Sequence, residues 1–281
     1  MLKVLEAGFY STIQDTGRFG YREFGVPVSG AMDGYSSGFA NALLGNEEHA
    51  ALIEMTLVGG KFQFLEPTSI VFSGANMHAR LNDKDVAQHK VINILNDDVL
   101  HFSNARHGFR TYLAIKGGFR TNVVLESQSQ YKPITANGII KKGELIPYQP
   151  FSNLQNSNSK VKYDYSILKS NILDVYKGSE FNKLSVKERR QLEMGEFKVT
   201  KLNNRMAYQL EPAIENNLQP ILSSPVLPGT VQLTPNGNLI VLMRDCQTTG
   251  GYPRILQLTE RSMNTIAQKT SGNTLKFRLK E

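Results

Sequence analysis

The segment Lys61-Phe62-Gln63-Phe64-Leu65 gives the clearest fold signal in this chain of 281 residues. Its apolar and polar side chains alternate with a period of two, which is typical of a strand with one buried face. The turn residues Glu66-Pro67-Thr68 come next, and the apolar stretch Ser69-Ile70-Val71-Phe72 follows as an expected buried strand. Two short strands joined by a tight turn therefore set the pattern for the chain.

Short apolar segments separated by turn residues continue on both sides of this pair. Asn82-Asp83-Lys84 lies between two such segments and predicts a hairpin loop. Further strands are expected over 91–95, 99–102 and 110–116. Strands this short and this closely spaced predict a mainly β fold of barrels or sandwiches, with few helices, and not alternating β-α-β units.

Three helices are expected among the strands. Asp33, Ser185 and Thr259 are the predicted N-caps, because their side chains can accept a hydrogen bond from a free amide of the first helical turn. Glu188 lies three residues after Ser185 and completes a capping-box pattern. The helix that Asp33 caps is expected to end at Gly45, which suits a left-handed C-cap.

The two halves of the sequence resemble each other weakly. Three pairs of segments align in the same order: 60–65 with 229–234, 70–72 with 239–241, and 18–21 with 205–208. Any two strands share alternation, so each match is weak alone. The preserved order favours two β units related by a diverged internal duplication.

The length of the chain fits about two domains of ~150 residues each. The stretch from Ser152 to Lys160 is polar, lacks apolar periodicity and is the most linker-like part of the sequence. We therefore expect an N-terminal β domain over residues 1–155 and a C-terminal β domain over residues 156–281.

Composition excludes several classes of protein. The net charge of +7 is spread thinly, and no basic stripe is interleaved with aromatic residues, so we expect no nucleic-acid partner. The single cysteine, Cys246, excludes an intramolecular disulfide and a multi-cysteine metal site, and we expect no metal. The longest aliphatic run, Leu239 to Met243, is too short to span a membrane. Glu6 follows the start too soon for a signal peptide, so a cytoplasmic location is expected.

Standard catalytic motifs are absent from the sequence. There is no phosphate-binding P-loop, no G-x-G-x-x-G, no G-x-S-x-G and no H-E-x-x-H. There is also no Met-Lys-Met that could carry biotin, so we expect no covalently bound cofactor. Cys246 has no neighbouring base in sequence to lower its pKa, and we expect an unreactive thiol.

Two loops concentrate polar side chains and glycines where strands would otherwise simply end. The first is Gln14-Asp15-Thr16-Gly17-Arg18-Phe19-Gly20-Tyr21 and continues over 25–33; the second is Gln247-Thr248-Thr249-Gly250-Gly251-Tyr252. Free amides beside hydroxyl groups can hold carboxylate or carbonyl oxygens, and Arg18 adds a fork for an anion. Ordinary turn formation explains the same residues equally well, and a helix cap is the alternative role for Asp33.

The motifs of both loops resemble one protein family. The matching segments are Thr12-Ile13-Gln14-Asp15, Gly17-Arg18, Gly20-Tyr21, Gly25-Val26-Pro27, Ser29-Gly30-Ala31-Met32-Asp33, Asn204-Arg205-Met206 and 247–253. They are similar to the family that contains the 5-oxoprolinase C subunit, KipA-type antagonists of a sporulation-kinase inhibitor, and the carboxyltransferase parts of urea carboxylase and urea amidolyase. The likeness runs from Val4 to about Phe277.

The sequence departs from the family pattern at three places. Leu125-Glu126-Ser127-Gln128-Ser129-Gln130 stands where the family usually has Leu-Gly-Ser-Arg-Ser-Thr, so we assign no role to that loop. Cys246 replaces a common arginine, and Ala207 replaces a usual glycine.

The resemblance implies two cyclophilin-like β-barrel domains and a function in a hetero-oligomer. The implied activity is that of the C subunit of an ATP-dependent 5-oxoprolinase, a hydrolase that opens 5-oxoproline to glutamate. The implied partners are the A subunit of that enzyme and its KipI-like B subunit. ATP is then a substrate of the complex, bound by this chain or by a partner.

The resemblance also suggests roles for individual residues. Asp15 or Asp33 is the expected proton acceptor, and Arg18 is expected to anchor an anionic group. Arg205 completes the site or mirrors Arg18 in the second half. The remaining expected substrate-binding residues are Gln14, Ser29, Gln247, Thr248, Thr249, Gly250 and Gly251. These assignments require the arginine-bearing and threonine-glycine loops to meet around a shared anion.

Two other functions remain open from the sequence. The chain could be the carboxyltransferase component of a biotin-dependent enzyme similar to urea carboxylase. It could also be a non-enzymatic antagonist of a KipI-like kinase inhibitor.

Overall fold

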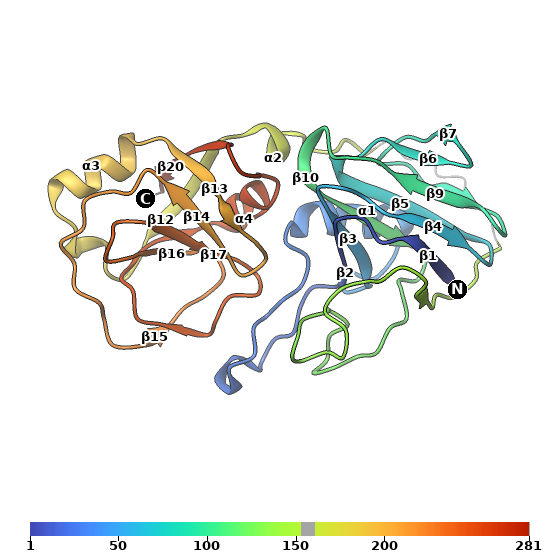
Figure 1. Ribbon diagram of the computed structural model, residues 1–281, viewed down its shortest axis with the longest axis horizontal. Helices are drawn as coiled ribbons and strands as arrows, with labels where there is room; N and C mark the ends of the chain where they lie inside the picture. The colour runs from blue at the N-terminus through green and yellow to red at the C-terminus, as the bar shows by residue number, and fades with distance from the viewer. Residues whose placement is uncertain (153–160, 281) are drawn as a thin grey trace. The chain divides into compact units, whose positions relative to one another are not determined.

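The computed structural model describes residues 1–152 and 161–280, which divide between two compact units (Figure 1). Unit 1 comprises Met1–Arg18 and Ser29–Leu168, and unit 2 comprises Phe19–Val28 together with the chain from Lys169 onward. The predicted boundary between residues 155 and 156 lies outside the described residues. The membership of Phe19–Val28 in unit 2 depends on contacts with residues far along the chain, which no local pattern indicated.

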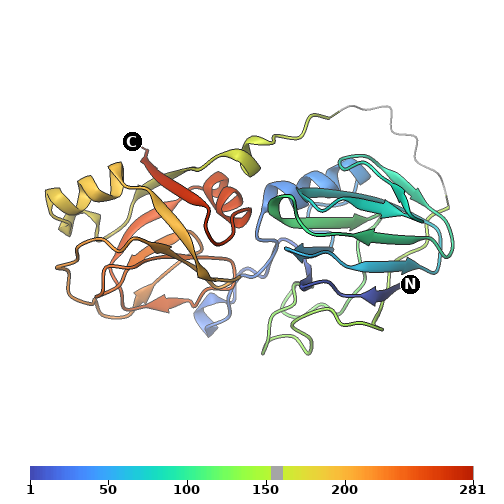
Figure 2. The same cartoon turned by 45° about the horizontal axis from the view of Figure 1, so that its top comes forward.

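Unit 1 contains two sheets. One has the strand order β11-β1-β4-β9-β6-β7 and the other β2-β3-β10-β5-β8, with helix α1 packed against β5 and β10 (Figure 2). The elements are β1 (Leu2–Glu6), β2 (Tyr10–Gln14), α1 (Gly34–Leu44), β3 (Leu52–Thr56), β4 (Lys61–Phe64), β5 (Thr68–Asn76), β6 (Ala79–Leu81), β7 (Lys84–Asp85), β8 (Ile92–Ile94), β9 (Val99–Phe102), β10 (His107–Ile115), β11 (Leu145–Ile146) and α2 (Ser166–Lys169).

Side chains from both sheets form one core in unit 1. Phe62 and Phe64 alternate with half-buried neighbours along β4, as the period of two predicted. Strand β5 is buried from Thr68 to Ala75, which confirms the expected buried strand. Phe72 of β5 and Phe102 of β9 pack edge to face with ring centroids 5.2 Å apart. This contact joins the five-stranded sheet to the six-stranded sheet.

The predicted hairpin is present between β6 and β7. Leu81 pairs with Lys84, so Asn82 and Asp83 form a two-residue loop. Both loop residues have positive φ, 47° and 62°. This conformation matches the right-handed twist of the flanking strands and suits Asn and Asp.

Unit 2 is built around a closed barrel of seven strands (Figure 1). The order is β12-β19-β16-β17-β14-β13-β20, and a parallel pairing of β12 with β20 closes the ring. The elements are η1 (Arg22–Phe24), β12 (Ile172–Lys177), η2 (Phe181–Lys183), α3 (Val186–Met194), β13 (Phe197–Asn203), β14 (Ala207–Glu211), β15 (Ser224–Pro225), β16 (Thr230–Leu233), β17 (Leu239–Leu242), β18 (Thr249–Gly250), β19 (Arg254–Leu258), α4 (Glu260–Ala267) and β20 (Thr274–Leu279).

All three predicted helix caps are confirmed. The Asp33 side chain accepts from the amide of Ser36 at the start of α1. Ser185 and Glu188 form a complete capping box at α3. The Thr259 side chain accepts from the amide of Ser262 at the start of α4.

The mainly β prediction is confirmed, with four α-helices among the described residues. The expected barrel is present in unit 2, whereas the strands of unit 1 divide between two sheets that share a core. The aligned segments 60–65 and 229–234 both contain a strand, β4 and β16. Their neighbours differ, because β16 pairs with β17 while β4 and β5 lie in different sheets. The internal duplication therefore remains an interpretation of the sequence.

Neither a membrane-crossing helix nor a metal-binding cluster is found in residues 1–152 and 161–280. No helix there is both long enough and apolar enough to cross a bilayer. No group of three or more His, Cys, Asp or Glu side chains is placed to hold a metal ion.

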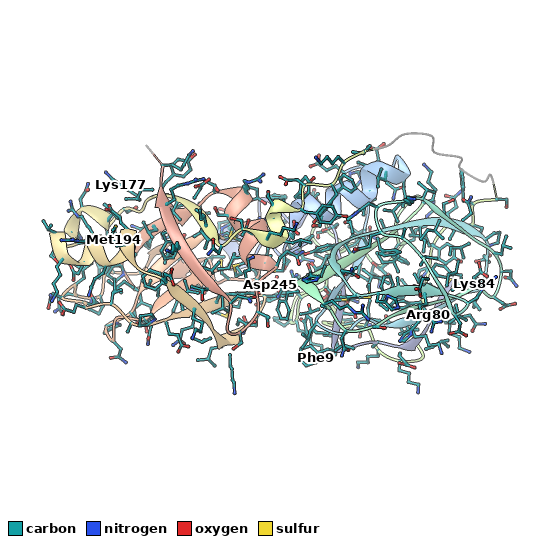
Figure 3. The ribbon with its side chains drawn as sticks, turned by 90° about the horizontal axis from the view of Figure 1, so that it is seen from above. Phe9, Arg80, Lys84, Lys177, Met194 and Asp245 are labelled. Carbon is teal, nitrogen blue, oxygen red and sulfur yellow. The ribbon has the colours of Figure 1, made fainter. Side chains whose placement is uncertain are left out.

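Replacing Phe102 with alanine is expected to destabilise unit 1 by about 3–5 kcal/mol, because truncating a buried aromatic side chain leaves a cavity. Phe9→Ala is the matched control, since Phe9 is 67% exposed and is labelled at the surface in Figure 3. Urea unfolding followed by circular dichroism measures both variants. An equal loss of stability in the two variants would contradict the placement of Phe102 in the core.

Candidate functional site

Asp15 stands at the end of β2 in unit 1, and its carboxylate is surrounded by hydrogen-bond donors. Oδ1 accepts from the Gly17 amide at 2.8 Å, the Ser127 hydroxyl at 2.7 Å and the Ser129 hydroxyl at 2.5 Å. Oδ2 accepts from the Gln128 amide at 2.6 Å. Only 9% of the residue is exposed, so these donors replace water around the charge. The carboxylate therefore organises the loop over 127–129.

Arg18 holds the same loop from its other side. Its side chain is buried, and Nη2 donates to the Ser129 carbonyl at 2.5 Å. Nε donates to the Val124 carbonyl at 3.5 Å. The contacts described for this guanidinium are thus to backbone oxygens of unit 1. The expected role of Arg18 as an anion anchor remains a prediction.

The loop held by Asp15 and Arg18 is the one that departs from the family pattern. Leu125 and Glu126 both have positive φ, 52° and 59°. An isolated antiparallel β-bridge joins Val124 to Ser127 on either side of them. A non-glycine residue in the left-handed region is strained. The side chain of Gln128 stabilises the loop further, because its Nε2 donates to the Phe119 carbonyl at 2.8 Å. Sequence analysis missed this structural role.

Gln14 and Ser29 are fully buried in unit 1 and keep unused polar atoms. Gln14 Nε2 donates to the Thr12 hydroxyl at 3.0 Å and to the Gln130 carbonyl at 3.2 Å. Gln14 Oε1 and the Ser29 hydroxyl have no hydrogen-bond partner among the described residues. Ser29 also has a φ of 57°, and the following Gly30 packs so closely on Thr16 that an added Cβ would lie 2.8 Å from its carbonyl carbon. Both residues therefore remain candidates for contact with a ligand.

Asp33 caps α1 and belongs to a buried network. Its Oδ1 accepts from the Ser36 amide at 3.0 Å and its Oδ2 from the Ser36 hydroxyl at 2.5 Å. Its own amide donates to the Tyr112 hydroxyl at 2.8 Å. Burial raises the pKa of Tyr112 well above its ordinary value, and the charges of Glu54 and Asp33 add to this effect. The capping interpretation is thus confirmed, while a catalytic role for Asp33 stays a prediction.

Sequence analysis missed a buried ion pair next to this network. Glu54 of β3 and Arg110 of β10 are both buried, with Oε1 and Nε 3.7 Å apart. Glu54 Oε2 also accepts from the Met32 amide at 2.8 Å. Tyr112 lies directly opposite Glu54 in the strand pairing. Charged residues inside otherwise apolar strands were the available signal for this pair.

In unit 2, Arg205 forms a bidentate ion pair with Asp245. Nε donates to Oδ2 at 2.8 Å and Nη2 to Oδ1 at 3.1 Å, and both side chains are buried. The backbone amide of Asp245 also donates to the Arg205 carbonyl at 2.9 Å. Asp245, labelled in Figure 3, lies in the turn just before Gln247 and was not predicted from the sequence. This pair anchors the start of the threonine-glycine loop.

Backbone hydrogen bonds fix the rest of the loop over 247–251. Thr249–Gly250 forms β18 and pairs with β15, Ser224–Pro225. The Val226 amide donates to the Thr248 carbonyl at 3.0 Å. An added Cβ on Gly250 would lie 2.6 Å from Gln232 Nε2, so this position favours glycine.

The side chains of the same loop differ in accessibility. Thr249 is exposed, and Thr248 and Gln247 are half-buried. Gln247 Oε1 is buried and has no hydrogen-bond partner in the described part of the chain. The loop therefore presents hydroxyl groups and one unused acceptor.

Arg22, which sequence analysis did not single out, reaches this loop from the segment Phe19–Val28. Its Nη2 donates to the Val226 carbonyl. Its side chain also adjoins the buried thiol of Cys246. Burial raises the pKa of Cys246 to about 11, although the Arg22 charge acts in the opposite direction. The thiol is thus protonated at neutral pH, in accord with the expected lack of reactivity.

The predicted site residues fall into two sets. Gln14, Asp15, Arg18, Ser29 and Asp33 belong to unit 1, where Asp15 and Arg18 meet at the loop over 124–129. Arg205 and the residues over 247–251 belong to unit 2. The expectation that the two sets share one anion stays a prediction.

Comparison with known proteins identifies the family of this chain. Residues 24–279 match the family model described as carboxyltransferase domain, subdomain A and B, and the chain belongs to this family. It is 32% identical to the 5-oxoprolinase C subunit of Escherichia coli (strain K12) over 283 aligned residues, covering 99% of this chain and 90% of that protein. The identity and coverage are the same for the 5-oxoprolinase C subunit of Haemophilus influenzae. The family resemblance read from the motifs is therefore confirmed.

The fold also has a close structural counterpart. The crystal structure of the K. lactis urea amidolyase matches 98% of this chain with a TM-score of 0.89 and 27% identity. The match covers only 18% of the urea amidolyase chain. The present chain thus corresponds to a small part of that enzyme but to nearly the whole of the two bacterial proteins.

Arg205→Gln is expected to destabilise unit 2 by about 3–5 kcal/mol, because it leaves the Asp245 carboxylate buried without its counter-ion. Arg278→Gln is the matched control, since Arg278 also pairs with an aspartate through two nitrogens but is 60% exposed. Solvent screens that pair, so its loss is expected to be much smaller. Chemical unfolding measures the loss of stability in both variants. Equal losses would contradict the proposed role of the Arg205–Asp245 ion pair.

The Cys246 thiol is expected to resist iodoacetamide at pH 8 in the folded protein and to react once urea unfolds the chain. Its raised pKa keeps the reactive thiolate scarce until the pH approaches 11. Intact-mass measurement counts the added groups. Stoichiometric alkylation of the folded protein within minutes at pH 8 would contradict this environment.

Proposed function

We propose that this chain is the C subunit of an ATP-dependent 5-oxoprolinase, which opens 5-oxoproline to glutamate together with A and B subunits. The observation that carries the proposal is the match to two proteins named as the C subunit of 5-oxoprolinase, along 99% of this chain and 90% of each relative. The cytoplasm, where ATP is abundant, is the expected place of action.

The chemistry explains why ATP is needed. A lactam amide is stabilised by resonance and is a poor electrophile. Transfer of the terminal phosphoryl group of ATP to the lactam oxygen would release ADP and turn that oxygen into a leaving group. Water then attacks the ring carbon, the carbon–nitrogen bond breaks and the nitrogen takes up a proton, which leaves an acyl phosphate. A second water hydrolyses the acyl phosphate and releases phosphate. The sum is 5-oxoproline, ATP and two waters giving glutamate, ADP and phosphate.

The residues of unit 2 supply donors suited to an oxygen that gains negative charge. Thr249 is an exposed residue and Thr248 is half-buried, on a loop that is held by pairing with β15 and by the ion pair at its start. Preorganised donors of this kind stabilise a developing oxyanion more than mobile water does. We assign Thr248, Thr249 and the glycines at 250 and 251 to the lactam oxygen.

Among the acidic candidates we favour Asp15 over Asp33 as the proton acceptor. Asp33 is fully buried and engaged as a helix cap, whereas Asp15 keeps 9% of its surface exposed. Four donors hold the Asp15 carboxylate in place, and a base of this kind would act through a bound water.

A carboxyltransferase role is the second candidate, because the matching family model describes a carboxyltransferase domain. In that case the chain would transfer a carboxyl group from carboxybiotin on a companion protein to a urea-like amide. The same hydroxyl donors would then stabilise a carbamate-like oxyanion.

Reconstitution separates the two candidates. The purified chain is mixed with candidate A and B subunits, ATP and 5-oxoproline, and glutamate release is measured. Glutamate that appears only when all three proteins and ATP are present supports the oxoprolinase. No glutamate from folded components, together with carboxylation of urea in the presence of a biotin carrier and its carboxylase, would favour the carboxyltransferase.

Replacing both Thr248 and Thr249 with alanine is expected to lower kcat/KM of the reconstituted enzyme at least about tenfold, because both hydroxyl donors to the oxyanion are lost. Thr270→Ala is the control, since Thr270 is a half-buried threonine of unit 2 outside the loop. Initial rates of glutamate formation give the comparison. Activity within twofold of wild type in the double variant would remove these residues from the site.

A further inference from the structure

Two buried polar atoms near the threonine-glycine loop lack hydrogen-bond partners within the described residues. They are Nη1 of Arg22 and Oε1 of Gln247. Buried polar groups are almost always hydrogen-bonded, and leaving one unpaired costs about 1–3 kcal/mol. Each of these atoms therefore calls for an explanation.

Contacts within unit 2 bring the two residues to the same loop. Arg22 Nη2 donates to the Val226 carbonyl, and the Val226 amide donates to the Thr248 carbonyl at 3.0 Å. The Arg22 side chain also adjoins Cys246, which directly precedes Gln247. The guanidinium thus lies beside the backbone that carries Gln247 and Thr248.

The nearest acidic side chain of the loop does not compete for Arg22. Asp245 is held by Arg205 through both carboxylate oxygens. The described partners of Arg22 are a backbone carbonyl and a thiol with a raised pKa, and neither neutralises the positive charge. A bound anion would supply the missing charge and accept from Nη1.

The two unpaired atoms have complementary chemistry. Arg22 Nη1 is a cationic donor, and Gln247 Oε1 is a neutral acceptor. A ligand that satisfies both presents an anionic oxygen and a hydrogen-bond donor. Arg22 and Gln247 are half-buried as whole residues, so part of each side chain is open to solvent.

We propose that Arg22 and Gln247 form a subsite for a small carboxylic acid that carries an N–H or O–H donor next to its carboxylate. The identity of this acid rests on the proposed function: 5-oxoproline has its carboxylate on the carbon beside the lactam N–H. Arg22 then binds the carboxylate, Gln247 accepts from the lactam nitrogen, and the hydroxyls of Thr248 and Thr249 remain for the lactam oxygen. Arg22 takes over the anion-binding role that the sequence had suggested for Arg18.

Binding to the full chain tests the subsite without turnover. Ligand-observed NMR titration compares 5-oxoproline with cyclopentanecarboxylate, which lacks the N–H donor, and 2-pyrrolidinone, which lacks the carboxylate. We expect 5-oxoproline to bind at least about tenfold more tightly than either fragment, since each fragment satisfies only one of the two atoms.

Substitutions assign the two halves of the subsite. Arg22→Gln is expected to weaken 5-oxoproline binding at least about tenfold and to leave 2-pyrrolidinone binding unchanged. Gln247→Leu is expected to weaken 5-oxoproline binding and to leave cyclopentanecarboxylate binding unchanged. Arg22→Lys, which keeps the charge, is expected to retain part of the affinity and covers the case in which Arg22→Gln does not fold.

Arg189→Gln is the matched control. Arg189 is also a half-buried arginine of unit 2, donates Nη2 to a backbone carbonyl at 2.7 Å, and has a buried Nε without a partner among the described residues. It lies on α3, outside the loop, so wild-type binding is expected. Circular dichroism and thermal melting confirm that each variant is folded.

The outcomes distinguish the subsite from the proposed function. The subsite is overturned if the wild-type chain does not bind 5-oxoproline, or if both Arg22 variants bind it as tightly as Arg189→Gln. Glutamate formation by the reconstituted wild type with an unchanged KM in Arg22→Gln also overturns the subsite but leaves the function intact. Selective binding that depends on Arg22 and Gln247, without glutamate formation, supports the subsite and removes the proposed function.

Discussion

The burial of charged side chains without loss of their hydrogen bonds is the constraint on which both candidate loops depend. In unit 1, four donors from residues 17, 127, 128 and 129 surround the carboxylate of Asp15. In unit 2, Arg205 donates two hydrogen bonds to Asp245. A buried charge without partners would be far more costly than the loop conformations it imposes. These hydrogen bonds and the ion pair hold the two loops in their conformations.

The described hydrogen-bond partners of three arginines differ in charge. Arg18 and Arg205 donate to carbonyls and to a carboxylate within their own units. Arg22 has one nitrogen fixed on the Val226 carbonyl and no acidic partner described for it. A guanidinium that is positioned but not neutralised is suited to recognise an anion.

The two candidate reactions place similar demands on the threonine-glycine loop. Lactam opening and carboxyl transfer to a urea-like amide both develop negative charge on an amide-derived oxygen. Rigid hydroxyl and amide donors meet this demand in either reaction. We therefore propose the same type of site for either reaction, and we expect the partner proteins to decide which one takes place.

Local signals in the sequence determined the strands, the three helix caps and the hairpin at Asn82. Each depends on residues a few positions apart, whose backbone preferences act before the chain is folded. Only the tertiary structure decided the pairing of Arg205 with Asp245, of Glu54 with Arg110, and of Arg22 with the Val226 carbonyl 204 positions away. Such partners are chosen by strand order and burial, because a charge selects its counter-ion only after the fold has removed water from around both.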